Sequence, residues 1–162
     1  MWGRSKKGAL EKGAQAPAFA LRNLAGDSVS LADILAKGPA LLAFYKVSCP
    51  VCQLTFPFLE RLAGGTGLQI IGISQDDFGS ATAFNQRFGV TFPTLLDQAK
   101  DGYPASNAFG ITNVPTMFLV EPDGQIANTI SGFSKHDLEG LGARVGIKTF
   151  RADENVPEWK AG

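Results

Sequence analysis

The chain has 162 residues, a length that fits one domain with a sizeable core. Fifteen basic and fifteen acidic residues leave no formal net charge at pH 7, so the composition points to neither a nucleic-acid partner nor an anionic membrane. No segment approaches about 18 consecutive apolar residues, which argues against a helix that crosses a bilayer.

The predicted elements follow in chain order, after a flexible arm at residues 1–14. The arm is basic and lacks the apolar stretch of a secretory signal. We therefore expect a cytoplasmic protein, or a periplasmic or membrane-anchored one if a signal segment was removed. Residues 15–147 form the predicted domain, and residues 148–162 a polar tail.

Short apolar runs alternate with helical patterns inside the domain, which is typical of an α/β sheet. The run Ala40–Lys46 is apolar almost throughout, as in a central strand buried on both faces. The other predicted strands are 18–24, one within 27–31, 68–74, 94–96, 116–120 and 125–131. The predicted helices are 30–35, one from the cysteine motif to Gly64, 80–88, 101–109 and one from Ser134 to Val145. This order predicts a central mixed sheet with helices on both faces.

The two cysteines of the chain both lie in the motif Cys49-Pro50-Val51-Cys52. The motif joins the predicted central strand to a helix, with Cys49 at the N-cap and Pro50 at the first helical position. Free N–H groups and the helix dipole then favour the thiolate of Cys49. Cys52 lies one turn along and can attack a mixed disulfide. We therefore expect Cys49 to be the attacking thiol and Cys52 the resolving thiol.

Three plainer interpretations of the cysteine pair compete with this one. A structural disulfide closing so small a ring contributes only about 2 kcal/mol, below the roughly 3 kcal/mol of a fifteen-residue loop. A zinc site needs two more ligands, and His136 is the single histidine. Inert core cysteines rarely lie at the start of a helix. We therefore expect neither a metal nor a bound cofactor.

Several motifs together resemble the thioredoxin superfamily, and within it the TlpA/ResA-like proteins related to AhpC/TSA redoxins. The resemblance extends over about residues 17–145. It rests on the strand-to-motif junction 44–52, Pro57 within the following helix, the segments 88–93 and 96–97, Val114-Pro115-Thr116, and the segments 122–125 and 131–132. It implies a thioredoxin-like fold and thiol–disulfide exchange.

The resemblance also assigns residues to the substrate side of the site. It implies that Pro115 is cis and packs beside the cysteines, while Val114 offers backbone groups to a substrate peptide. The plainer interpretation is that Pro115 only begins a strand. Ser48 stands where the family usually has tryptophan, so Ser48, Pro50 and Val51 present an altered partner surface.

The resolving thiol Cys52 needs a proton acceptor, and two positions in the sequence bear on its identity. The buried aspartate of thioredoxins corresponds to Ala43 here, so that group is missing. TlpA/ResA-like proteins use a glutamate just past the next strand, where this chain has Asp76 and Asp77. We expect Asp77 to accept the proton, with a solvated loop carboxylate as the alternative.

The favoured function is a thiol–disulfide oxidoreductase that reduces protein disulfides. Its expected partners are protein or small-molecule disulfides and thiols and an upstream electron donor such as a thioredoxin system. A peroxidase is a second hypothesis, but the Pro-x-x-x-Thr-x-x-Cys pattern of peroxiredoxins places Leu42 and Lys46 at its first two positions. No arginine lies between Arg87 and Arg144 to hold a peroxide. A third hypothesis is a non-catalytic binding module on this fold.

Overall fold

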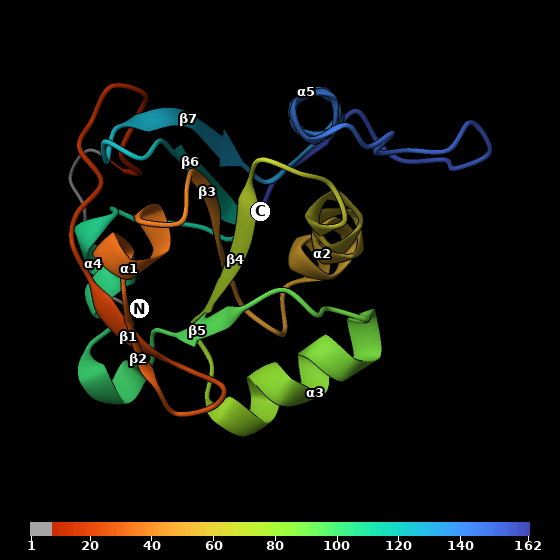
Figure 1. The fold of residues 1–162 in the computed structure, drawn as a ribbon. Helices are drawn as coiled ribbons and strands as arrows, with labels where there is room; N and C mark the ends of the chain where they lie inside the picture. Colours follow the sequence, from red (N-terminus) through yellow and green to blue (C-terminus); the bar gives the residue numbers. More distant parts are fainter. Residues whose placement is uncertain (1–7) are drawn as a thin grey trace.

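The computed structural model describes residues 8–162, and a seven-stranded sheet lies at its centre (Figure 1). The strands are β1 (Ala20–Asn23), β2 (Ser28–Ser30), β3 (Ala40–Tyr45), β4 (Gln69–Ser74), β5 (Thr94–Leu96), β6 (Thr116–Val120) and β7 (Ile126–Ser131). They are ordered β2-β1-β5-β4-β3-β6-β7. β4 is parallel to β3 and β5, and the other neighbours are antiparallel. The predicted mixed sheet is confirmed.

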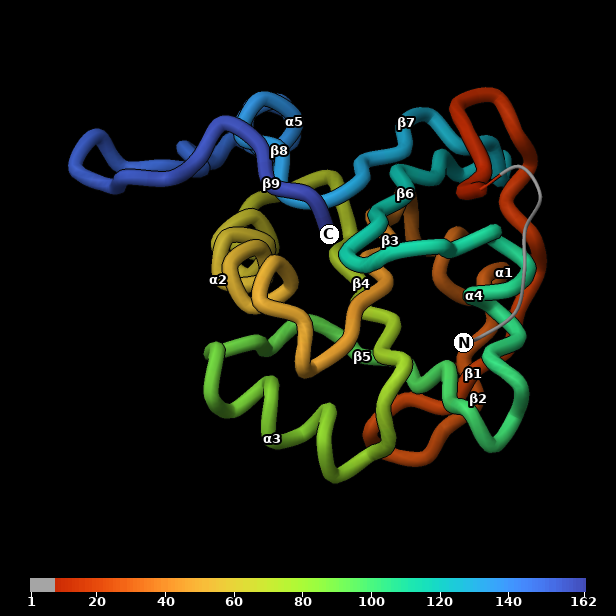
Figure 2. The backbone as a smooth tube through the Cα atoms, turned by 180° about the vertical axis from the view of Figure 1, so that it is seen from behind, coloured from red at the N-terminus to blue at the C-terminus, as the bar shows by residue number. Residues whose placement is uncertain are grey.

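Helices cover both faces of this sheet, as Figures 1 and 2 show from opposite sides. α1 (Leu31–Leu35) and α4 (Pro104–Ala108) lie on one face. α2 (Pro50–Ala63), α3 (Phe78–Phe88) and α5 (Lys135–Val145) lie on the other. The predicted thioredoxin-like α/β architecture is therefore confirmed.

The central strand β3 fixes where the cysteine motif begins. All six of its residues are fully buried, because helices cover the sheet on both sides. Phe44 packs on Phe109 with ring centroids 5.2 Å apart, and Tyr45 packs on Phe56 of α2 at 4.2 Å. Successive side chains of β3 thus pack against the helices on opposite faces of the sheet. After this buried strand the chain enters α2 at Pro50.

Two helices differ from the sequence prediction. α3 begins at Phe78, two residues early, because the carboxylate of Asp77 accepts the Ser80 N–H at 2.8 Å and caps the helix. The predicted helix at 101–109 is interrupted. A 3₁₀ turn at Ala99–Asp101 ends at Gly102, whose φ is +78°, and α4 starts only at Pro104.

The predicted arm and tail contact the domain where the structure describes them. Residues 1–7 of the arm lie outside the described residues. The Leu10 N–H donates to the Phe109 carbonyl at 3.0 Å, and Thr129 Oγ1 donates to the Leu10 carbonyl at 2.8 Å. In the tail, Phe150 is buried, and a short strand β9 (Trp159–Lys160) pairs with β8 (Phe133–Ser134). The division into arm, domain and tail stays a prediction.

Candidate active site

The junction between β3 and α2 places Cys49 at a helix N-terminus. Cys49 is the N-cap residue of α2 with extended backbone, and Pro50 occupies the first helical position. The Cys52 N–H donates to the Cys49 sulfur at 3.3 Å. Because the first N–H groups of a helix lack intrahelical partners, they are available to a thiolate at this position. The predicted cap geometry is confirmed.

This environment makes Cys49 acidic. The side chain of Cys52 hydrogen-bonds its sulfur, and the backbone N–H groups of Cys52 and Val51 add to the effect. Together they outweigh partial burial and lower the pKa of Cys49 to about 6. Cys49 is therefore largely a thiolate at neutral pH, and it remains partly accessible to solvent.

Cys52 has the opposite properties. Its side chain has no exposed surface, and burial raises the pKa of its thiol well above the ordinary value. The hydrogen bond to Cys49 and the charges of Cys49 and Asp76 raise the pKa of Cys52 further, while a backbone hydrogen bond with Lys46 acts in the opposite direction. One thiol of the pair is thus ionised and reachable, and the other is protonated and covered.

Asp76, rather than Asp77, is hydrogen-bonded to the loop that leads to Cys49. Asp76 lies two residues after the end of β4, and its Oδ2 accepts the Val47 N–H at 2.8 Å, in the loop that leads to Cys49. Its charge acts on Cys52. Asp77 instead is exposed and caps α3, and the hydrogen bonds of Ser80 lower its pKa. The two neighbouring aspartates thus have different partners in the fold. The sequence alone could not show which of them contacts the cysteine loop.

The loop before β6 supplies the other wall of the site. The Val114–Pro115 peptide bond is cis, as the family resemblance implied, and the Cys49 sulfur lies 3.4 Å from the Val114 carbonyl oxygen. Thr116 Oγ1 donates to the Asn113 carbonyl at 2.8 Å, which fixes the turn. The structure therefore brings Val114 and Pro115 to the cysteine pair.

Behind the loop before β6, the buried carboxylate of Asp97 binds the backbone at the start of α4. Asp97 is fully buried and accepts the N–H groups of Ala105 and Ser106 at 2.9 and 2.7 Å. It thus holds the start of α4, from which the chain continues to the cis bond. The sequence singled out Asp97 only as part of a family motif.

The predicted contact residues beside the motif differ in exposure. Ser48 and Pro50 are exposed, whereas Val51 is half-buried and packs against the core. Among residues 8–162, no three His, Cys, Asp or Glu side chains come together in an arrangement that could hold a metal ion.

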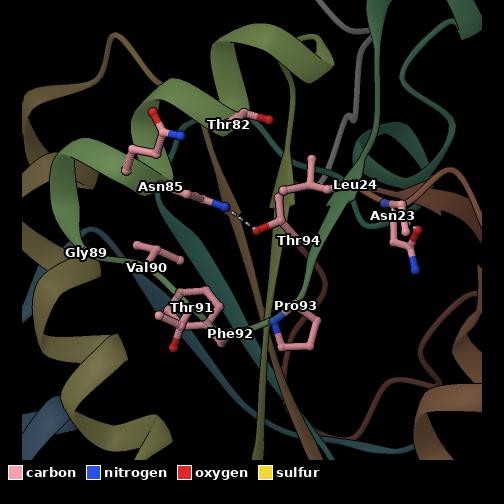
Figure 3. A pocket seen from close by; sticks show the side chains of 12 residues that line it. Asn23, Leu24, Thr82, Asn85, Gly89, Val90, Thr91, Phe92, Pro93 and Thr94 are labelled. Atoms are coloured by element: carbon pink, nitrogen blue, oxygen red, sulfur yellow. Dashed lines mark hydrogen bonds between the residues drawn. The ribbon is translucent and has the colours of Figure 1, made fainter.

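A concavity of about 570 Å³ lies elsewhere, between α3, the segment 89–94 and residues 23–25 (Figure 3). Asn85 Nδ2 donates to Thr94 Oγ1 there at 3.0 Å, and the Thr82 hydroxyl is buried without a hydrogen-bond partner. No residue of the cysteine motif or the cis-proline loop lines it. It is therefore separate from the exchange site.

We compared the chain with known protein families and with related proteins. The sequence profile of the AhpC/TSA family matches residues 12–129. The chain belongs to the AhpC/TSA family. This family member is 30% identical over 140 residues to the thiol-disulfide oxidoreductase ResA of Geobacillus kaustophilus, which covers 83% of this chain and 78% of the relative. It is 32% identical over 124 residues to ResA of Halalkalibacterium halodurans, covering 74% and 68%.

A solved structure supports the fold of this AhpC/TSA family member. The thioredoxin domain of a thiol-disulfide oxidoreductase from Bacteroides vulgatus superposes with a TM-score of 0.74 at 24% identity, covering 84% of this chain and 98% of that one. The ResA relatives identify the chain as an oxidoreductase of the thiol–disulfide class. Within residues 8–162, no helix has the length and apolar character needed to cross a membrane.

Proposed function

We propose that this chain exchanges dithiol and disulfide through Cys49 and Cys52, with protein disulfides as its substrates. The observation that carries the proposal is the contrast between the two thiols. Cys49 is accessible with a pKa lowered to about 6, and Cys52 is fully buried with a raised pKa. This contrast supports distinct roles for the two thiols.

The exchange has two balanced steps. The Cys49 thiolate attacks one sulfur of a substrate disulfide, forms a mixed disulfide and releases the other substrate sulfur as a thiolate. Cys52 then loses its proton, and its thiolate attacks the Cys49 sulfur. The second substrate thiolate leaves, and Cys49 and Cys52 remain as a disulfide. Two electrons pass to the substrate, and an upstream donor such as a thioredoxin system restores the dithiol.

Asp76 is our proposed proton acceptor for Cys52. Its charge already raises the pKa of Cys52, so it disfavours early ionisation of the buried thiol. Once the mixed disulfide has removed the charge on Cys49, a nearby carboxylate can take the Cys52 proton. Asp77, which the sequence favoured, is committed to the cap of α3.

Ser48, Pro50 and Val51 are the proposed contact surface on the motif side, with Val114 and Pro115 opposite. The proposal covers the reducing direction, and a cytoplasmic or an extracytoplasmic location is compatible with it. Fractionation of cells that produce the full-length protein would separate these locations.

The deciding experiment is a redox titration of the Cys49–Cys52 pair in defined glutathione or dithiothreitol buffers, followed by alkylation of free thiols. A potential near roughly −270 mV supports a reductase, and one near about −120 mV indicates a disulfide donor. The Cys52→Ser variant should trap a mixed disulfide with a protein substrate. If Cys49 and Cys52 form no reversible disulfide at any reduction potential of the buffer, the proposal is wrong.

A thiol peroxidase is the second candidate, because AhpC/TSA membership and the lowered pKa of Cys49 both suit it. The peroxidase pattern would place Leu42 and Lys46 near the sulfur, and Leu42 is buried within β3. Stopped-flow mixing of the reduced protein with hydrogen peroxide tests this candidate. Oxidation of Cys49 much faster than that of a free thiol would favour it.

A further inference from the structure

The tail after α5 is anchored on the helix that carries the cysteines. Phe150 is buried, and its ring centroid lies 4.7 Å from that of Phe58 in α2. Arg61, also in α2, donates to both carboxylate oxygens of Glu154 at 2.7 and 2.9 Å. Its Nη1 also donates to the Thr149 carbonyl at 2.6 Å. Such a bidentate pair fixes both partners in direction, so it holds the tail along α2.

Residues 157–162, called the strap from here on, run from this anchor along β8. The Lys135 N–H donates to the Glu158 carbonyl at 3.0 Å, and β9 then pairs antiparallel with β8. The indole N–H of Trp159 donates to the Ser131 carbonyl at 3.2 Å. The strap therefore forms a small two-stranded sheet with β8, separate from the seven-stranded sheet.

The strap continues to the carbonyl that faces Cys49, and Figure 2 shows this end of the chain close to the loop before β6. A side chain at Gly162 would collide with the carbonyl oxygen of Val114. The same Val114 oxygen lies 3.4 Å from the sulfur of Cys49. A side chain at Gly132 would likewise collide with the Lys160 carbonyl. Main chain is thus packed on main chain beside the reactive sulfur.

Little holds the strap on this surface. Residues 157–162 are all exposed, and Trp159 retains 59% of its accessible surface. β8 and β9 contribute only two residues each, and isolated two-stranded ribbons are at best marginally stable. Because Phe150 and Glu154 anchor the tail further back, the strap can leave without loss of the domain.

We propose that β8 and the backbone edge at 113–114 bind an extended segment of a protein substrate, and that the strap occupies this surface in its place. Extended peptides add to exposed strand edges through main-chain hydrogen bonds. The partner is therefore a polypeptide that is extended next to its disulfide, and it must displace the strap. A small disulfide needs only to reach the Cys49 sulfur. This inference rests on the exchange chemistry proposed above.

The test compares the whole chain with a variant that lacks residues 157–162, both reduced beforehand. Each reacts with insulin as a protein disulfide and with hydroxyethyl disulfide as a small one, and alkylation stops the reaction. If the strap is displaced in about a tenth of the molecules, its removal raises kcat/KM for insulin about tenfold. The rate with hydroxyethyl disulfide should change by less than about twofold, because that reagent does not need the surface of β8.

A point variant tests the same binding surface with the strap still attached. Gly132→Ala places a methyl group against the Lys160 carbonyl and should release the strap. Gly146→Ala is the matched control. Its φ of +77° is close to the +73° of Gly132, so the backbone strain is alike, but nothing lies within 4 Å of the added methyl group. Only Gly132→Ala should slow the reaction with insulin, because the added methyl group also meets the main chain of a substrate that takes the place of Lys160.

A synthetic peptide with the sequence of residues 157–162 should raise the KM of the truncated variant for insulin, whereas a scrambled peptide should not. Equal kcat/KM values for insulin in the whole chain and in both strap variants would overturn the inference and leave the exchange proposal intact. If neither the whole chain nor the variants react with hydroxyethyl disulfide, the exchange proposal itself is wrong.

Discussion

Cys49 and Cys52 lie one helical turn apart, yet their surroundings drive their acidities in opposite directions. Cys49 stands at the N-cap, where hydrogen bonds from Cys52 and from backbone N–H groups stabilise its charge. Cys52 is carried to the buried side of α2, where desolvation dominates. The spacing in the sequence predicted both roles, because one helical turn separates a cap from a buried face.

The first prediction concerns the pH at which Cys49 becomes reactive. Because its pKa is lowered to about 6, alkylation by iodoacetamide should rise with pH and level off just above that value. In Cys52→Ala the midpoint should move upward, since the Cys52 side chain is the largest cause of the low pKa. Cys52→Ser keeps a hydrogen-bond donor and should move the midpoint less. An unchanged midpoint in Cys52→Ala would contradict this account.

The second prediction separates the two neighbouring aspartates. Asp76→Asn removes the proposed proton acceptor, so the step in which Cys52 resolves a mixed disulfide should slow by about 100-fold at neutral pH. The pKa of Cys52 should also fall, because the charge of Asp76 raises it. Rapid-quench measurement of mixed-disulfide decay over a pH series reports both effects.

Asp77→Asn is the control, because asparagine caps a helix as well as aspartate does. It should leave both the resolving step and the stability unchanged, although Asp77 is the residue that the sequence favoured. A slow resolving step in Asp77→Asn with a normal one in Asp76→Asn would reverse the assignment.

At the scale of elements, the sequence predicted a helix or strand correctly where residues within or next to that element determine it. A helix was predicted at 30–35, and α1 forms there, with Ser30 and Asp33 in a capping box at its start. The run that became β3 was recognisable because a strand covered on both faces has no polar side. The break between Asp101 and Pro104 was missed, although Gly102 and Pro104 are both residues that end or begin helices.

The third prediction uses two glycines of α5 that the sequence did not distinguish. A methyl group at Gly140 meets nothing within 4 Å, so Gly140→Ala should stabilise the protein by about 1 kcal/mol through helix propensity. A methyl group at Gly142 would collide with Thr149 and with the Ile147 carbonyl. Gly142→Ala should therefore destabilise the protein by about 1–3 kcal/mol. Urea unfolding of the two variants measures both changes, and equal effects would contradict the packing described here.

At the scale of the whole molecule, the sequence predicted the α/β domain but not how its tail is used. Residues 148–162 are polar overall, and this composition is typical of a tail. Their docking depends on Phe150 entering an aromatic cluster with Phe58 and Phe133, and on Arg61 reaching Glu154 from far along the chain. Pairs so distant in sequence leave no periodic pattern, so only the structure reveals them.

The last prediction concerns the attachment of the tail to α2 and its dependence on pH. The hydrogen bonds and charge of Arg61, with a further hydrogen bond from Arg151, lower the pKa of Glu154 to about 2. The folded-state pKa lies below the ordinary value of 4.5, so the pair stabilises the fold above pH 4.5 and this stabilisation is lost as the pH falls through about 2.

Glu154→Gln should therefore have a lower thermal midpoint than the natural protein at neutral pH, and the gap should close as the pH falls toward 2. Glu158→Gln is the matched control. Its side chain is 84% exposed, its carboxylate lies 3.6 Å from the Lys135 ammonium group, and exposed pairs of this kind contribute little. The Glu158→Gln midpoint should follow that of the natural protein at every pH. If both variants behave alike, Glu154 does not anchor the tail, and the strap has no fixed point from which to reach the active site.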